Sequence, residues 1–85
     1  MADVQVYVTT YCPYCVRAKG LLNRKKVAFT EINVDDDPEK RAWLAKATGQ
    51  RTVPQIFIDG KSVGGSDDLH DLERLGELDK LLGRS

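Results

Sequence analysis

The hydrophobic pattern divides the first part of the chain into a strand, a helix and a second strand. Residues 4–9 are β-branched or aromatic and apolar at most positions, which predicts a central strand covered on both faces. Residues 13–25 change to helical spacing, with apolar side chains every three or four positions. A second strand is expected within residues 27–34. This order is a βαβ unit, so the two strands should be parallel and joined by a right-handed crossover.

A turn and a second helix follow. Three aspartates at positions 35–37, then Pro38, place acids and a proline where a helix begins. We expect this helix over residues 39–48, ended by Gly49. The acidic triplet could suggest a metal loop, but it lacks the glycine and the distal glutamate of a calcium loop. We therefore interpret it as capping and solvation.

A hairpin comes next. Residues 55–58 predict a third strand, with Pro54 at its entrance, which is one of the few places where a strand accepts proline. Asp59 and Gly60 form a strong two-residue hairpin signal. A short antiparallel strand should therefore follow at residues 61–63.

The remaining residues predict two helical segments. Ser66 is the expected N-cap of a helix whose buried stripe contains leucines at positions 69, 72 and 75. Gly76 interrupts this helix, and leucines at positions 78, 81 and 82 suggest a short last helix that packs on the sheet. The order βαβ-α-ββα predicts one compact α/β domain over residues 1–85.

Composition and charge exclude some classes of function. Thirteen basic residues balance thirteen acidic ones, which argues against nucleic acid as the main partner. Basic side chains crowd the first helix, where we interpret them as a solvated surface: Arg17, Lys19, Arg24, Lys25 and Lys26. No apolar stretch approaches the ~20 residues that span a bilayer, and no leader pattern is evident at the start. We expect a cytoplasmic protein with no membrane contact.

The candidate chemistry lies at Cys12-Pro13-Tyr14-Cys15, between the first strand and the first helix. A thiol at a helix N-terminus meets free backbone N–H groups and the positive end of the helix dipole. Such cysteines have a pKa of roughly 3.5–7.5, against about 8.5 for a free thiol. Cys12 should be exposed and acidified, and Cys15, one turn further in, should be covered. This pattern predicts a nucleophile and a resolving cysteine.

The two cysteines have three other possible interpretations. A structural disulfide would close a very short loop and so stabilise little. A zinc site normally needs four Cys or His ligands, and the chain offers these two cysteines and the distant His70. Two inert cysteines remain an alternative, although the strand-to-helix context favours a redox pair.

Three motifs together resemble a dithiol glutaredoxin: Cys12-Pro13-Tyr14-Cys15, Thr52-Val53-Pro54 and Gly64-Gly65-Ser66-Asp67-Asp68. The similarity covers essentially the whole chain. It implies a thioredoxin-like fold with a four-stranded mixed sheet flanked by helices. It also implies that the cysteine pair lies at the edge of a glutathione groove, with a cis peptide bond before Pro54 facing the cysteines.

The resemblance further implies which residues bind glutathione. The backbone of Val53 would pair with the cysteine of glutathione, and backbone N–H groups at the start of the third helix would bind the γ-glutamyl carboxylate. Asp67 would take the ammonium group, and Arg51 would meet the glycine carboxylate. The full set is Tyr14, Arg51, Thr52, Val53, Pro54, Gly65, Ser66 and Asp67. Two positions depart from the family pattern: Thr9 replaces a common lysine, and Ser66 replaces a common third cysteine.

The implied activity is glutathione-dependent thiol-disulfide exchange. Cys12 alone would reduce glutathione mixed disulfides, and Cys12 with Cys15 would reduce protein disulfides. Glutathione is then a co-substrate, with no permanently bound cofactor and no metal. Glutathionylated or disulfide-containing proteins are the expected partners of a monomer served indirectly by the glutathione reductase system. Two alternatives are a thioredoxin-type reductase and a carrier of a [2Fe–2S] cluster, although Pro13 resembles the members without a cluster.

Overall fold

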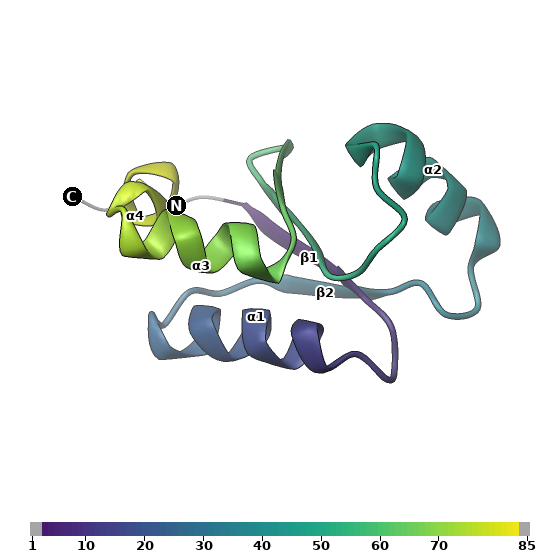
Figure 1. Ribbon diagram of the computed structural model, residues 1–85, viewed down its shortest axis with the longest axis horizontal. Coiled ribbons are helices and arrows are strands. Elements are labelled where there is room, and N and C mark those ends of the chain that lie inside the picture. The colour runs from purple at the N-terminus through teal and green to yellow at the C-terminus, as the bar shows by residue number, and fades with distance from the viewer. Residues whose placement is uncertain (1–2, 84–85) are drawn as a thin grey trace.

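The computed structural model describes residues 3–83 and contains four strands and four helices within them (Figure 1). In chain order these are β1 (Val4–Val8), α1 (Pro13–Arg24), β2 (Thr30–Asn33), α2 (Pro38–Thr48), β3 (Gln55–Ile58), β4 (Lys61–Gly64), α3 (Ser66–Arg74) and α4 (Glu77–Leu81). Every predicted element is present, with bounds that differ by a few residues at most. No helix within the described residues is long and apolar enough to span a membrane.

The four strands form one mixed sheet in the order β2-β1-β3-β4. β1 and β2 are parallel, as expected for strands joined by a crossover helix, and β3 is antiparallel to both β1 and β4. The hairpin between β3 and β4 turns at Asp59 and Gly60, which have φ values of 52° and 82°. Two consecutive left-handed residues define the tight turn that the Asp-Gly pair predicted. This thioredoxin-like arrangement confirms the expected fold.

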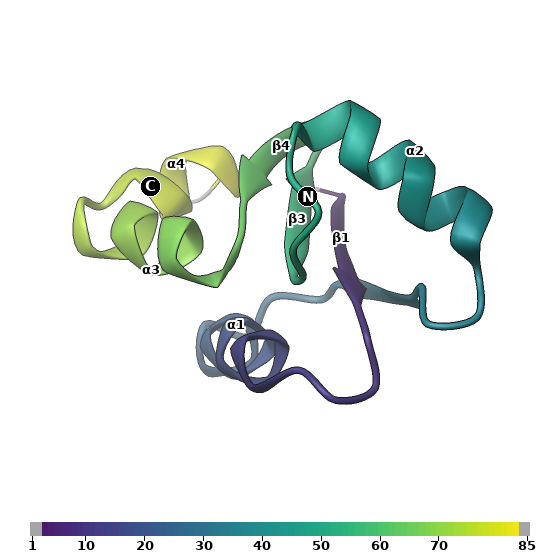
Figure 2. The ribbon, with the colours of Figure 1, turned by 45° about the vertical axis from the view of Figure 1, so that its right-hand side comes forward.

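Strand alternation divides the core between the two faces of the sheet. Val4, Val6 and Val8 pack with buried residues of α1, α3 and α4 on one face. Tyr7 and Phe57 point to the other face, where they pack with Leu44 of α2 and with Val34. Figure 2 shows these layers, with α1 and α3 on one side of the strands and α2 on the other. The central strands β1 and β3 are therefore covered on both faces, as their apolar sequences predicted.

Two predictions for α3 are wrong. The N-cap is Gly65 rather than Ser66, and no side chain caps the helix at that position. Instead the carboxylate of Asp68 accepts a hydrogen bond of 3.0 Å from the Gly65 N–H, which is half of a capping box. Leu75 is 69% exposed because α3 ends at Arg74 and the chain turns at Gly76. The helical stripe therefore does not extend to Leu75, and Leu78 of α4 is buried in its place.

Lys25 is not a solvated surface residue as predicted. Its Nζ lies 2.8 Å from a carboxylate oxygen of Glu73 and 2.8 Å from one of Asp79, and its side chain is only 13% exposed. Hydrogen bonds to Asp79 and Glu73 raise the pKa of Lys25 above its ordinary value. The end of α1 is thereby joined to α3 and α4.

Candidate active site

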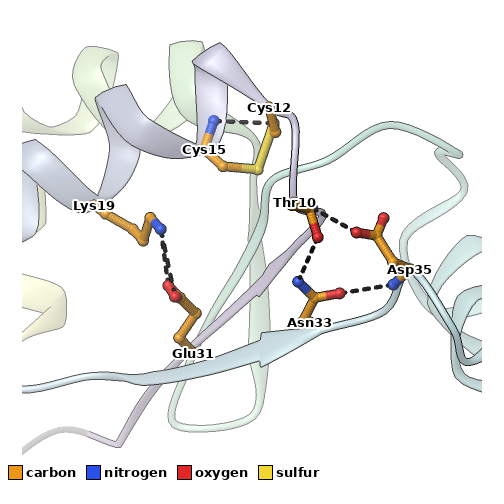
Figure 3. Close-up of polar contacts among 7 residues, drawn as sticks. All are labelled: Thr10, Cys12, Cys15, Lys19, Glu31, Asn33 and Asp35. Carbon is orange, nitrogen blue, oxygen red and sulfur yellow. Dashed lines mark hydrogen bonds and ion pairs between the residues drawn. A yellow bond between two sulfur atoms is a disulfide. The ribbon is translucent and has the colours of Figure 1, made fainter.

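The two cysteines lie at the start of α1 and form a disulfide (Figure 3). Cys12 is the N-cap of the helix, with the extended backbone (φ −146°, ψ 96°) that this position requires. Its Sγ accepts a hydrogen bond of 3.1 Å from the backbone N–H of Cys15. Pro13 occupies the first turn, where no N–H is needed. The sulfur of Cys12 therefore stands where the N–H groups and the dipole of α1 favour negative charge.

Cys15 is buried as the sequence predicted, but Cys12 is more buried than expected. Cys12 is 8% exposed and Cys15 is 1% exposed, so the expected order is correct but the expected exposure of Cys12 is wrong. The reason is tertiary, because Cys12 Sγ lies 3.5 Å from the carbonyl oxygen of Val53, 41 positions further along the chain. The loop before β3 covers one side of the sulfur.

That loop contains the predicted cis peptide bond, between Val53 and Pro54. Pro54 is buried, and its carbonyl oxygen would lie 3.2 Å from a Cβ added at Gly65. The absence of a side chain at Gly65 thus allows the start of α3 to approach the loop. Three segments far apart in sequence meet here: the start of α1, the loop before β3 and the start of α3.

A groove of about 220 Å³ opens where these segments meet. It is lined by Tyr14, Gln50, Thr52, Val53, Pro54, Gly65, Ser66, Asp67 and Asp68. The groove thus brings together every predicted glutathione contact except Arg51. Gln50 and Asp68 also line it. Neither was among the predicted contacts, although Asp68 is the last residue of the motif that begins at Gly64 and Gln50 lies two positions before Thr52.

Arg51 instead lines a second hollow, of about 630 Å³, along α2. Arg41 and Lys46 line the same hollow, which contains no acidic side chain among its lining residues. The side chain of Arg51 is therefore not among those that line the groove beside Thr52. This hollow gathers three cations that could attract an anionic group.

Ser66 is buried at the inner end of the groove. Its hydroxyl has no hydrogen-bond partner among residues 3–83. Its carbonyl oxygen lies 2.8 Å from Nδ1 of His70, one turn along α3. An unpartnered hydroxyl beside the N-terminus of a helix is a site where a polar ligand atom could bind.

A metal site has no support in the described part of the chain. Residues 3–83 contain no group of three His, Cys, Asp or Glu side chains arranged to hold a metal ion. Two of the three acids at positions 35–37 have other partners: Asp37 caps α2 by accepting from the Lys40 N–H, and Asp35 accepts from the Thr10 N–H.

A Cys-x-x-Cys pair at the start of a helix, a cis-proline beside it and a four-stranded mixed sheet define a class of protein. They are the features of a thioredoxin-fold protein with a dithiol–disulfide site.

Comparison with known proteins narrows this class. The sequence model of the family described as Glutaredoxin matches residues 4–63. A glutaredoxin of Pseudomonas aeruginosa is 58% identical over 82 residues, covering 96% of this chain and 98% of the relative. Glutaredoxin 3 of Escherichia coli K12 is 50% identical over 82 residues, covering 96% of this chain and 99% of the relative. This chain belongs to the glutaredoxin family, whose members are thiol-disulfide oxidoreductases.

Solved structures agree with this assignment. The crystal structure of a buckwheat glutaredoxin–glutathione complex superposes with a TM-score of 0.91 at 36% identity, covering 96% of this chain and 77% of that one. The solution structure of a glutaredoxin from Brucella melitensis has a TM-score of 0.86 at 51% identity, covering 94% of this chain and 87% of that one.

Proposed function

We propose that this protein is a glutathione-dependent oxidoreductase that reduces glutathione mixed disulfides through Cys12 and protein disulfides through Cys12 and Cys15. The observation that carries this proposal is the position of Cys12 Sγ. It accepts a hydrogen bond from the Cys15 N–H at the start of α1 and lies against Val53, which lines the groove. A nucleophilic sulfur and a binding groove are thereby adjacent.

Cys12 is the nucleophile of the pair because its thiolate is the better stabilised. The helix N-terminus lowers the pKa of a thiol at this position, and the Cys15 N–H, which donates to Cys12 Sγ in the disulfide form, can also donate to a thiolate there. Cys15 lies within the first turn and is almost fully buried, so an external disulfide reaches Cys12 first.

The groove suits an extended peptide with charged ends. The backbone of Val53 can pair with the cysteine of glutathione, as a strand edge pairs with an extended chain. The N-terminus of α3, with the buried Ser66 hydroxyl, favours the γ-glutamyl carboxylate, and exposed Asp67 can bind the ammonium group. Arg51, with Arg41 in the second hollow, can attract the glycine carboxylate if glutathione extends along α2. The buckwheat relative that superposes on this chain is described as a glutathione complex, which supports this choice of ligand.

The single-cysteine route proceeds in two exchanges. The Cys12 thiolate attacks the glutathione sulfur of a mixed disulfide, and the original S–S bond breaks. The substrate leaves as a thiolate that takes a proton, and Cys12 is joined to glutathione. A second glutathione thiolate attacks the bound glutathione sulfur, which releases oxidised glutathione and regenerates the Cys12 thiolate.

The two-cysteine route begins with attack of Cys12 on a protein disulfide, forming a mixed disulfide with the substrate. Cys15 then attacks the Cys12 sulfur and expels the second substrate thiol, leaving the Cys12–Cys15 disulfide. The 5.1 Å between the two Cα atoms is compatible with that bond. Two molecules of glutathione then reduce the disulfide and supply the two electrons.

Serine substitutions of each cysteine test the separate roles proposed for Cys12 and Cys15. Cys12→Ser should abolish reduction of both a glutathione mixed disulfide and a protein disulfide in an assay recycled by glutathione. Cys15→Ser should keep the first activity and lose the second, because only the second needs a resolving thiol. A Cys15→Ser protein inactive toward both substrates would refute this assignment.

A second experiment tests the glutathione groove. Asp67→Ala should raise the KM for a glutathione mixed disulfide, whereas Asp71→Ala, the same change further along α3 and outside the groove, should not. Each protein is also assayed with a thioredoxin reductase in place of glutathione. Turnover with that reductase and none with glutathione would favour the thioredoxin-type alternative.

A further inference from the structure

Three residues form a hydrogen-bonded ring, through side chains and backbone N–H groups, at the loop that leads to Cys12 (Figure 3). Thr10 lies in that loop, between the end of β1 and the start of α1. Asn33 is the last residue of β2, and Asp35 follows it by two positions. We name these three residues the Thr10 ring.

Two of the three hydrogen bonds of the ring are made by Thr10. The Thr10 N–H donates to Asp35 Oδ2 at 2.7 Å, and Asn33 Nδ2 donates to Thr10 Oγ1 at 3.4 Å. The ring closes because the Asp35 N–H donates to Asn33 Oδ1 at 2.8 Å, which also determines the orientation of the Asn33 amide. Hydrogen bonds from the side chain and the backbone of Thr10 lower the pKa of Asp35, so its carboxylate is ionised and the bond to the Thr10 N–H is charge-assisted.

We propose that Asp35 and Asn33 are positioning residues for Cys12. By holding Thr10, they keep Cys12 over the Cys15 N–H when the disulfide is reduced. In the oxidised protein the bond to Cys15 itself holds Cys12 on the helix. Reduction removes that covalent link, and the Thr10 ring then restrains the loop of residues 9–11 from the β2 side. The proposal rests on the proposed role of Cys12 as the nucleophile.

Positioning and charge have opposite effects on Cys12, so they can be separated. A loosened loop would let the sulfur leave the Cys15 N–H and would raise the pKa of the thiol. Removal of a nearby carboxylate would instead lower the pKa of the thiol, since a like charge disfavours the thiolate. Other charged groups near the ring stay in place in the variants below. They include Arg41, which attracts the Asp35 carboxylate, and the Lys19–Glu31 pair between α1 and β2.

The test compares Asp35→Ala, Asp35→Asn and the matched control Asp36→Ala, each in full-length Cys15→Ser protein with one thiol. Asp36 is an exposed neighbour of Asp35 and belongs to no hydrogen bond of the ring. The rate of alkylation by iodoacetamide is measured against pH to obtain the pKa of Cys12. Asparagine retains an oxygen that accepts from the Thr10 N–H, and alanine does not.

We expect Asp35→Ala to raise the pKa of Cys12 by about 0.5 and to lower turnover of a glutathione mixed disulfide about threefold. Asp36→Ala should remain close to the parent protein, and Asp35→Asn, which keeps the acceptor but loses the charge, should have a Cys12 pKa equal to that of the parent or slightly below it. The Thr10 amide proton, followed by NMR, should exchange faster with solvent only in Asp35→Ala. Asn33→Ala removes the hydrogen bonds of the Asn33 side chain to Thr10 Oγ1 and from the Asp35 N–H, but leaves the bond between the Thr10 N–H and Asp35. It should therefore shift the Cys12 pKa in the same direction by a smaller amount.

Two results would overturn the proposal. A lower pKa in both Asp35 variants would mean that Asp35 acts through its charge. An unchanged Cys12 pKa in Asp35→Ala, with or without a loss of thermal stability, would mean that the loop is positioned without the ring. Neither result bears on the proposed function, which is tested separately by the glutathione-dependent activity of the parent protein and of its Cys12→Ser and Cys15→Ser variants.

Discussion

Replacing Gln55 by methionine should change the activity of the protein while leaving its stability nearly unchanged. Gln55 is fully buried at the start of β3, directly after Pro54. Its amide Nε2 lies 3.0 Å from the carbonyl oxygen of Thr52 and 3.1 Å from Gln50 Oε1, so it joins the groove loop to the sheet. Its own Oε1 has no hydrogen-bond partner within residues 3–83.

Replacing Gln55 by methionine keeps the length of the side chain and removes its polar atoms. The lost hydrogen bonds to Gln50 Oε1 and to the Thr52 carbonyl oxygen contribute about 1 kcal/mol each, and the longer one to Thr52 Oγ1, at 3.4 Å, contributes less. The freed acceptors belong to the exposed residues Gln50 and Thr52, which water can reach. Removing a buried, unpaired amide oxygen gains about 1–3 kcal/mol. These contributions nearly cancel, so the free energy of unfolding should stay within about 1 kcal/mol of the wild type. Gln55→Glu should instead be several kcal/mol less stable at neutral pH, since a buried carboxylate there cannot donate these hydrogen bonds.

Urea denaturation of the oxidised proteins measures this balance, and Gln5→Met on β1 provides the same change at a half-buried glutamine. In the activity assay, Gln55→Met should raise the KM for a glutathione mixed disulfide more than it lowers kcat, because the loop of residues 50–53 is less restrained. If the free energy of unfolding of Gln55→Met is lower than that of the wild type by more than about 3 kcal/mol, this prediction is wrong, because the amide oxygen must then have hydrogen-bond partners in the folded protein. An unchanged KM would show that the loop does not depend on Gln55.

Two further predictions concern the start of α3 and the end of α1. Gly64→Ala should destabilise the protein by about 1–3 kcal/mol and weaken glutathione-dependent activity, because Gly64 has φ +102° and an added Cβ would clash with Asp68. Gly20→Ala in α1, where an added Cβ meets open space, is the control. Equal stability of Gly64→Ala and the wild type in thermal melts would contradict this prediction. The raised pKa of Lys25 means that its ion pairs stabilise the fold fully below about pH 10.4 and less as the pH rises through the raised value. Burial raises the pKa of Tyr7 too, so both groups contribute to alkaline destabilisation. Lys25→Met should therefore have a free energy of unfolding about 1–2 kcal/mol lower than the wild type at pH 7, and this free energy should decline less steeply between pH 10 and 12. If the free energies of unfolding of the two proteins decline equally steeply with pH, this role of Lys25 is excluded.

The sequence by itself determined the elements of this fold and the position of its chemistry. Strands and helices were predictable because alternation and helical spacing depend on the local backbone. The Asp59-Gly60 turn was predictable because few residues adopt two consecutive left-handed conformations. The position of the cysteine pair at the start of α1 was predictable because a helix N-terminus is a local feature of the sequence.

Only the tertiary structure decided how the site is enclosed. Three features follow from packing rather than from sequence spacing. They are the burial of Cys12 against Val53, the position of Arg51 in the hollow along α2, and the hydrogen bond from Gln55 to Thr52. The Thr10 ring joins the ends of two parallel strands whose adjacency depends on the crossover through α1. Local patterns determine which face a side chain takes within its element, but contacts between distant segments depend on how the elements pack, and this packing brings one sulfur, one loop and one helix N-terminus together.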